Sequence, residues 1–236
     1  MALQSLGGIG TNAATSPVDK LPMINSSRLA FLAPLCFALG FASSGAIAGS
    51  LTVQVTDSAG KPLADVVVVA DAEAGVAMPR LARPGEIEQR GLKFLPLVSV
   101  VQTGSRISFP NYDKVKHHIY SFSPAKKFDQ KLYSGVAAAP QVFDKAGLVV
   151  LGCNIHDRMV SYVKVVDSPY FAKTGADGVA RIAMPATGKY TVSAWHYNMT
   201  GAPAEQPVAL KGDAASALTF RLALKPAPTE SAAPGM

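Results

Sequence analysis

The chain has 236 residues, with 22 Lys and Arg against 16 Asp and Glu, and a formal net charge of +6. This excess is small and includes no run of like charges, which argues against a protein that binds nucleic acid through a strongly basic surface. The longest apolar run covers residues 29–42, and its fourteen residues are too few to span a bilayer comfortably. We therefore expect no membrane anchor in the mature chain.

Residues 1–48 are typical of a secretory signal peptide. Arg28 precedes the apolar run, and the small residues of "SSGAIA" follow it, ending at Ala48 in a sequence that suits signal peptidase. A start of translation at Met23 would give this signal an ordinary short basic beginning. Cleavage after Ala48 predicts a periplasmic or secreted protein whose first residue is Gly49.

Export changes the meaning of the cysteines. The sequence contains two, and Cys36 is removed with the signal peptide. Cys153 then stands alone in an oxidising compartment, where it has no partner for an internal disulfide and an idle thiol is a liability. A bound metal ion would give this thiolate a function.

The mature chain is predicted to be all-β. Short β-branched or alternating runs recur at close spacing, separated by turn sequences, and no segment keeps an apolar period of 3.6 residues. Helices should therefore be few and short, and about 190 residues fit two sandwich modules of roughly 80 to 100 residues each. The predicted strands include "LTVQVTD", "DVVVVAD", "FLPLVSVV", "SRISF", "HHIYSF", "LVVLG", "VSYVKVV", "VARIAM", "KYTVSAW" and "ALTFRLAL".

The stretch "VVLGCNIHDRM", at residues 149–159, places three metal-binding side chains close together in the sequence. Cys153 ends a predicted buried strand, and His156 and Met159 follow at intervals of three residues. A thiolate, two imidazoles and a distant thioether are the ligands of type 1 copper. The missing imidazole has to come from an upstream strand, and "HHIYSFSP", which begins with His117 and His118, offers two candidates.

Each of these residues also has a simpler explanation on its own. A lone cysteine is most often a buried core residue, a loop histidine is often only solvated, and methionine often fills a core. Their joint spacing favours copper over these explanations. Zinc is less favoured because a thioether is a poor zinc ligand, and a Cys–His hydrolase is less favoured because no oxyanion-binding signature accompanies the pair.

The loop at residues 153–159 resembles the copper-ligand loop of cupredoxins, and its short spacing is closest to that of amicyanin. Residues 86–168 resemble the cupredoxin-like proteins often named methylamine utilisation proteins, in which "HHxYSFSP" and "GCNIHD" occur together. Cupredoxins usually have asparagine directly after the first histidine, and His118 stands there in this chain, so it stays the alternative upstream ligand. The resemblance implies a Greek-key β-sandwich that holds one type 1 copper ion through His117, Cys153, His156 and, as axial ligand, Met159.

Such a site suggests electron transfer. It lets copper change oxidation state with little movement and reserves no open position for a substrate, so we expect a carrier of single electrons and not an enzyme. The resemblance implies that His156 is the exit for the electron and that the redox partner binds transiently. Asn111 is a candidate for bracing the turn before His117, where an ordinary turn asparagine is equally plausible. The nearby cations either form a basic docking rim or are simply solvated: Lys114, Lys116, Lys126, Lys127, Lys131 and Arg158.

The sequence leaves two other functions open. A copper-binding module for delivery or storage would use the same ligands in a looser site, with His118 or Met199 as transient ligands. A structural β-sandwich protein without metal is the third possibility. The complete set of two histidines, one cysteine and one methionine argues against the loss of the metal.

The sequence on either side of the cupredoxin-like segment resembles a second module. Residues 51–71 look like the opening hairpin of carboxypeptidase-regulatory-like or transthyretin-like sandwiches, and residues 174–195 look like the second half of such a module. We predict a discontinuous sandwich made of residues 49–85 and 169–225, because a sandwich tolerates a long insertion between two strands at small entropic cost.

This arrangement makes a topological prediction. The strand at 51–57 should pair with strands between residues 178 and 224, and the cupredoxin unit at 86–168 should be inserted between them. After the last strand, residues 226–236 are rich in Pro, Ala and Ser and are expected to be disordered.

Overall fold

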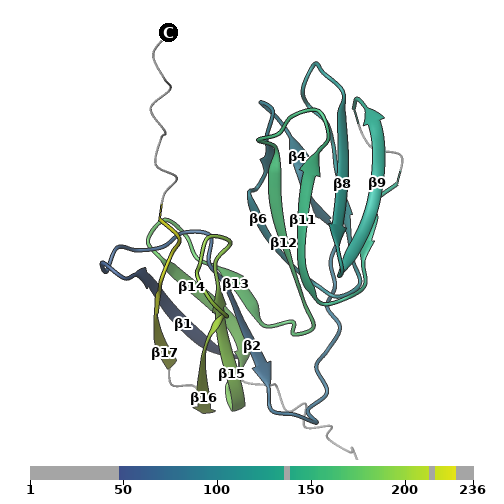
Figure 1. Ribbon diagram of the computed structural model, residues 1–236. Helices are drawn as coiled ribbons and strands as arrows, with labels where there is room; N and C mark the ends of the chain where they lie inside the picture. Colours follow the sequence, from purple (N-terminus) through teal and green to yellow (C-terminus); the bar gives the residue numbers. More distant parts are fainter. Residues whose placement is uncertain (1–47, 136–138, 213–215, 227–236) are drawn as a thin grey trace, which may run out of the picture. The chain divides into compact units, whose positions relative to one another are not determined.

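The computed structural model describes residues 48–135, 139–212 and 216–226 (Figure 1). The predicted signal peptide, apart from Ala48, and the tail from residue 227 onward lie outside the described residues. All regular structure in the described part of the chain is β-strand, so the predicted all-β fold class is confirmed. No helix long and apolar enough to cross a membrane occurs among these residues.

The central module contains two layers of strands. The first layer is a five-stranded sheet whose members lie side by side in Figure 1. In spatial order these strands are β6 (Val98–Gln102), β12 (Val160–Val166), β11 (Gly147–Cys153), β8 (His117–Ser123) and β9 (Lys126–Tyr133). The pairing is antiparallel throughout except between β12 and β6, which run parallel.

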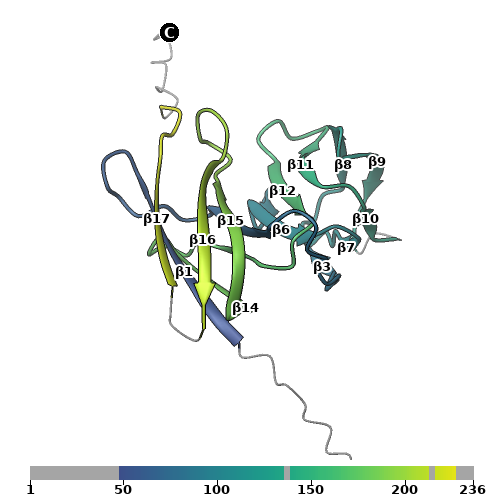
Figure 2. The same ribbon diagram turned by 90° about the horizontal axis from the view of Figure 1, so that it is seen from below.

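The second layer is shorter, and Figure 2 shows it beside the five-stranded sheet. It consists of β10 (Gln141–Phe143), β7 (Ser105–Ser108) and β3 (Gly85–Glu86), and a separate pair is formed by β4 (Glu88–Gln89) and β5 (Phe94–Leu95). Buried apolar side chains from both layers form one core cluster, which includes Ile107, Phe109, Ile119, Phe143, Leu151 and Val163. Burial of these side chains stabilises the module.

Strand alternation determines which residues face this core. In β8 the buried positions are His117, Ile119 and Ser121, and in β11 they include Leu151 and Cys153. Cys153 is the register partner of Ile119. Because side chains two residues apart share a face of a strand, His117 and Cys153 point to the same side at one end of the sheet.

The flanking module contains strands from both ends of the described chain. One sheet has the order β14 (Val179–Pro185), β1 (Ala48–Asp57) and β17 (Ser216–Leu222). The other has the order β13 (Phe171–Lys173), β2 (Val67–Ala72), β15 (Thr187–Trp195) and β16 (Ala204–Lys211). Their core cluster includes Leu51, Val53, Val68, Ile182, Val192 and Phe220.

Strands that precede the central module pair with strands that follow it. β1 runs antiparallel to β14 and parallel to β17, and β2 runs antiparallel to β13 and β15. Both sheets of the flanking module therefore combine segments more than one hundred residues apart in the sequence. The domain boundaries at residues 85 and 169 stay a prediction.

Candidate metal centre

The candidate site lies where β8 begins and β11 ends. His117 is the first residue of β8 and is fully buried, and Cys153 is the last residue of β11, with 4% of its surface exposed. The strand register brings both side chains to the core face, so the sheet itself positions these two donors.

The loop after Cys153 folds back on itself. The Met159 amide donates to the His156 carbonyl at 2.9 Å, and the Cys153 amide donates to the Met159 carbonyl at 3.3 Å. This closure returns the imidazole of His156 to Cys153. Met159 is 2% exposed and belongs to the same core cluster as Cys153.

Three donor atoms converge at this point, from His117, Cys153 and His156. The Nδ1 atoms of the two histidines are 3.2 Å apart, and the Cys153 sulfur lies 3.9 Å from Nδ1 of His117 and 3.5 Å from Nδ1 of His156. Among the residues that the structure describes, this is the only such group of His, Cys, Asp and Glu side chains.

The size of this triangle tests whether one metal ion fits. A point in the plane of the three atoms is equidistant from them at about 2.1 Å, close to metal–nitrogen bonds of about 2.0–2.1 Å and metal–sulfur bonds of about 2.3 Å. The side chains of His117, Cys153 and His156 would therefore be able to hold one metal ion together. A trigonal arrangement of two imidazoles and one thiolate is the donor geometry of type 1 copper, so the residues present fit that ion.

Asp113 holds the first histidine in place. Its Oδ2 atom lies 2.8 Å from Nε2 of His117 and accepts from the Leu92 amide at 3.1 Å, and its Oδ1 atom accepts from the Gly91 amide at 2.6 Å. When His117 donates its Nε2 proton to this carboxylate, the lone pair of Nδ1 faces Cys153. Asp113 thus selects the tautomer that can bind a metal.

The turn that supports Asp113 has an unusual backbone. Gly91 and Leu92 both adopt left-handed φ values, of 62° and 57°, a conformation that is costly for leucine. Burial alone would raise the pKa of Asp113, but the hydrogen bonds with His117, Leu92 and Gly91 hold this pKa below its ordinary value. The carboxylate is therefore kept ionised beside the imidazole.

Asn111 cross-links the segment that leads to His117. Its side-chain amide donates to the carbonyls of Val115 at 2.8 Å and Tyr133 at 3.0 Å, and its Oδ1 accepts from the Asp113 amide at 2.9 Å. The Tyr133 hydroxyl donates to the Phe109 carbonyl at 2.6 Å, and burial raises its pKa to about 12, so this phenol stays protonated. The proposed bracing role of Asn111 has a direct structural basis in these contacts.

The other candidates from the sequence lie elsewhere. His118 faces away from the core, and its ring contacts Asp129 of β9, so the structure brings His117 and not His118 to Cys153. Sequence reasoning missed Asp113, although a carboxylate four residues before a ligand histidine was a usable signal. It also missed Gln89, a fully buried residue whose amide donates to the Phe109 carbonyl at 3.2 Å.

Comparisons with known proteins concern the fold. No protein-family model matches the chain, and no curated protein sequence matches it significantly. Among solved structures, a purple cupredoxin from Nitrosopumilus maritimus is 22% identical, with 34% of this chain and 98% of that chain covered and a TM-score of 0.31. Amicyanin from Paracoccus versutus is 19% identical, with 44% and 99% covered and a TM-score of 0.32.

A third similar structure is that of a copper-containing enzyme. The copper-containing nitrite reductase from Thermus scotoductus is 20% identical, covering 48% of this chain and 28% of that chain, with a TM-score of 0.33. The solved structures similar to part of this chain thus include cupredoxins.

Proposed function

We propose that the chain is an exported type 1 copper protein that carries single electrons between transient redox partners. The observation that carries this proposal is the convergence of two imidazole nitrogens and one thiol sulfur, separated by 3.2, 3.5 and 3.9 Å. These separations suit one ion of trigonal coordination, and this donor set is typical of blue copper.

Each ligand has a defined role in the proposal. The Cys153 thiolate and Nδ1 of His117 and His156 would hold the ion, and the buried Met159 is the candidate axial ligand. Bound copper supplies a one-electron couple between its two common oxidation states. The chain contributes rigidity, because β8, β11, the closed loop and the Asp113 carboxylate hold the donors in position.

The proposal describes a carrier and not an enzyme. With Met159 as a fourth ligand beside His117, Cys153 and His156, no position would be reserved for a substrate, in contrast to catalytic metal sites, which combine three protein ligands with an open position. A site of this kind exchanges electrons with a partner that binds briefly. Export through the signal peptide at residues 1–48 would place the protein in the periplasm or outside the cell, where copper and redox partners meet it.

Copper titration of the purified mature protein tests the proposal. The Cu(II) protein should absorb strongly in the visible and show a narrow copper hyperfine splitting in EPR, and Cys153→Ser should abolish both. His117→Gln should also abolish the absorption. The matched control is His118→Gln, which changes the neighbouring histidine on the opposite face of β8 and should leave the spectrum intact.

Two results would contradict the proposal. If His117→Gln kept the absorption and His118→Gln lost it, the upstream ligand would be His118, on the other face of β8. Colourless binding, or binding of Cu(I) alone, would instead favour copper delivery or storage.

A further inference from the structure

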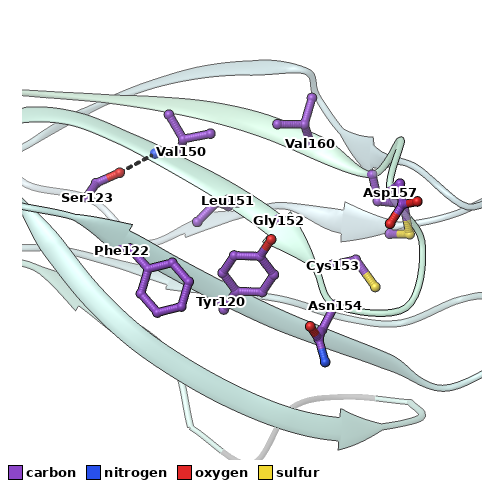
Figure 3. Close-up of a pocket in the computed structure, with 11 residues that line it drawn as sticks. Tyr120, Phe122, Ser123, Val150, Leu151, Gly152, Cys153, Asn154, Asp157 and Val160 are labelled. Atoms are coloured by element: carbon purple, nitrogen blue, oxygen red, sulfur yellow. Dashed lines mark hydrogen bonds between the residues drawn. The ribbon is translucent and has the colours of Figure 1, made fainter.

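A groove of about 550 Å³ lies on the outer face of the five-stranded sheet, against the strand that ends at Cys153. Figure 3 shows the rings of Tyr120 and Phe122, from β8, beside Val150 and Gly152 of β11. Here the two strands separate. Only Gly152 and Cys153 have register partners on β8, and the Val150 amide donates instead to the Ser123 hydroxyl at 2.9 Å.

Gly152 allows the Tyr120 ring to lie directly on the backbone of β11. A Cβ atom at residue 152 would be 2.8 Å from Cζ and 2.9 Å from the hydroxyl oxygen of Tyr120, distances that real Cβ atoms do not show. The φ angle of Gly152 is not in the positive range, so the backbone conformation does not require glycine. Since glycine weakens a strand, the close approach of the ring is the physical reason for its presence.

We propose that Tyr120 is a second electron port of the copper site, that is, a second side chain through which electrons enter and leave it, on the opposite face of β8 from His117. This inference rests on the proposed function. The ring touches the residue that is covalently attached to Cys153, so an electron crosses one through-space contact between the aromatic ring and the backbone that leads to the ligand sulfur. The His156 imidazole and Tyr120 would thus offer two separate routes to the same metal site.

The aromatic route continues to solvent. Phe122 is 78% exposed, and its ring centroid lies 5.1 Å from that of Tyr120. An exposed aromatic ring beside a groove is typical of an anchor for a protein partner. Phe122 therefore connects the port to a partner bound at the outer face.

The charges around the groove favour a partner that presents carboxylates. Lys127 is exposed and is the register partner of Phe122, so it lies on the outer face beside this ring, whereas Lys126 pairs with Ser123 and falls on the other face of β9. In the described part of the chain, neither lysine belongs to an ion pair with N to O distances of 4.0 Å or less. Asp129 is the register partner of Tyr120, where its carboxylate contacts His118, and Asp157 lines the far end of the groove. The proposed occupant of the groove is an acidic redox protein, whose carboxylates would face the basic charge of this chain at the Phe122 end.

Reduction kinetics test the port. Hexacyanoferrate(II) gives one electron to the Cu(II) protein and becomes hexacyanoferrate(III), and no proton or bond is transferred. Tyr120→Leu and Phe122→Ser should each slow this reaction about fivefold or more. Tyr120→Phe should keep the wild-type rate, because the route requires the ring and not the hydroxyl. Lys127→Glu should slow it about threefold or more at low salt.

Gly152→Ala tests whether the Tyr120 ring conducts electrons or only stabilises the fold. The added Cβ displaces Tyr120 while leaving it in the chain, so the rate should fall as in Tyr120→Leu. When Gly152→Ala is combined with Tyr120→Leu, the reduction rate should be no lower than in Tyr120→Leu alone. The visible spectrum and reduction potential of every variant are recorded, because an unchanged potential shows that the driving force is unchanged.

A second readout needs no copper. Hexacyanochromate(III) is a paramagnetic anion that does not react, and in the metal-free protein it should broaden the NMR signals of Tyr120, Phe122 and Lys127. The broadening should be weaker in Lys127→Glu. Broadening confined to residues 154–158, or equal broadening by a cationic probe, would overturn the proposed outer-face site.

The outcomes separate this inference from the proposed function. A protein that lacks the thiolate–copper absorption overturns both. A protein that has the absorption and an unchanged potential, but whose reduction rate is unaffected by Tyr120→Leu and Gly152→Ala, overturns the second port alone. Concentration-dependent self-association that Phe122→Ser abolishes would identify a second copy as the occupant and overturn the acidic partner.

Discussion

Asp113→Asn is the substitution that most directly tests how the chain prepares its metal ligands. The carboxylate uses one oxygen for the Gly91 amide and the other for the Leu92 amide and Nε2 of His117. An asparagine has one acceptor oxygen. In either orientation of the amide, its NH₂ group must face at least one of these donors, so a hydrogen bond and the negative charge are both lost.

The size of the effect follows from these contacts. Loss of a carboxylate that supports a ligand histidine weakens metal binding about 10- to 100-fold, which corresponds to about 1.4–2.8 kcal/mol. The carboxylate makes the imidazole a better donor and so favours Cu(II) over Cu(I). If the weakening falls on Cu(II) alone, the reduction potential rises by about 60–120 mV.

Cyclic voltammetry and competitive Cu(II) titration measure the two quantities. Asp129→Asn is the matched control, because Asp129 contacts His118 in the same way on the outer face of β8. That variant should leave the potential and the affinity close to wild type. Equal shifts in the two variants, or a lower potential in Asp113→Asn, would refute the reasoning that Asp113 acts through His117.

Two further predictions concern the flanking module and export. Burial lowers the pKa of His196, with Asp65 opposing, and its Nδ1 accepts from the Asn198 amide at 3.2 Å, so the folded state favours the neutral ring. The unfolded state then binds more protons than the folded state as pH falls through about 6.5. Urea unfolding should therefore show a free energy of unfolding that decreases from pH 7.5 to pH 5, and less steeply in His196→Gln. A steeper decrease in this variant would contradict a lowered pKa of His196 in the folded state. Mass spectrometry of the exported protein should give Gly49 as its first residue, and a chain that still contains residues 29–42 would contradict cleavage after Ala48.

The strands of the core were predictable because burial leaves a clear pattern. "VSYVKVV" coincides with β12, and "LVVLG" lies within β11. "FLPLVSVV" was expected as one run, but the structure divides it into β5 and β6 around Pro96, whose nitrogen has no proton to donate to a sheet. In each of these strands buried apolar side chains face a core, as Phe94, Leu151 and Val163 do.

The strands that escaped prediction carry weaker patterns. β9 contains "KKFDQKLY", a charged sequence that suits an edge strand, and β16 contains Pro207. Strands at a sheet edge are exposed on one face and along one side, and charged residues or proline there hinder association with other chains. Their sequences therefore resemble loops, and only pairing with β8 and β15 identifies them as strands.

The choice between the two adjacent histidines required the strand register. Cys153 pairs with Ile119, so alternation puts His117 on the core face and His118 outside, whereas the sequence alone permits either. The same register places Tyr120 opposite Gly152 on the outer face. A slip of one residue would exchange the two faces of β8, removing His117 from the ligand group and Tyr120 from Gly152 together. The irregularity in the pairing of β8 with β9 between His117 and Ile119 adjusts that edge strand while the register with β11 is kept. The ligand set and the proposed second port therefore depend on one structural feature, the pairing of Gly152 and Cys153 with β8.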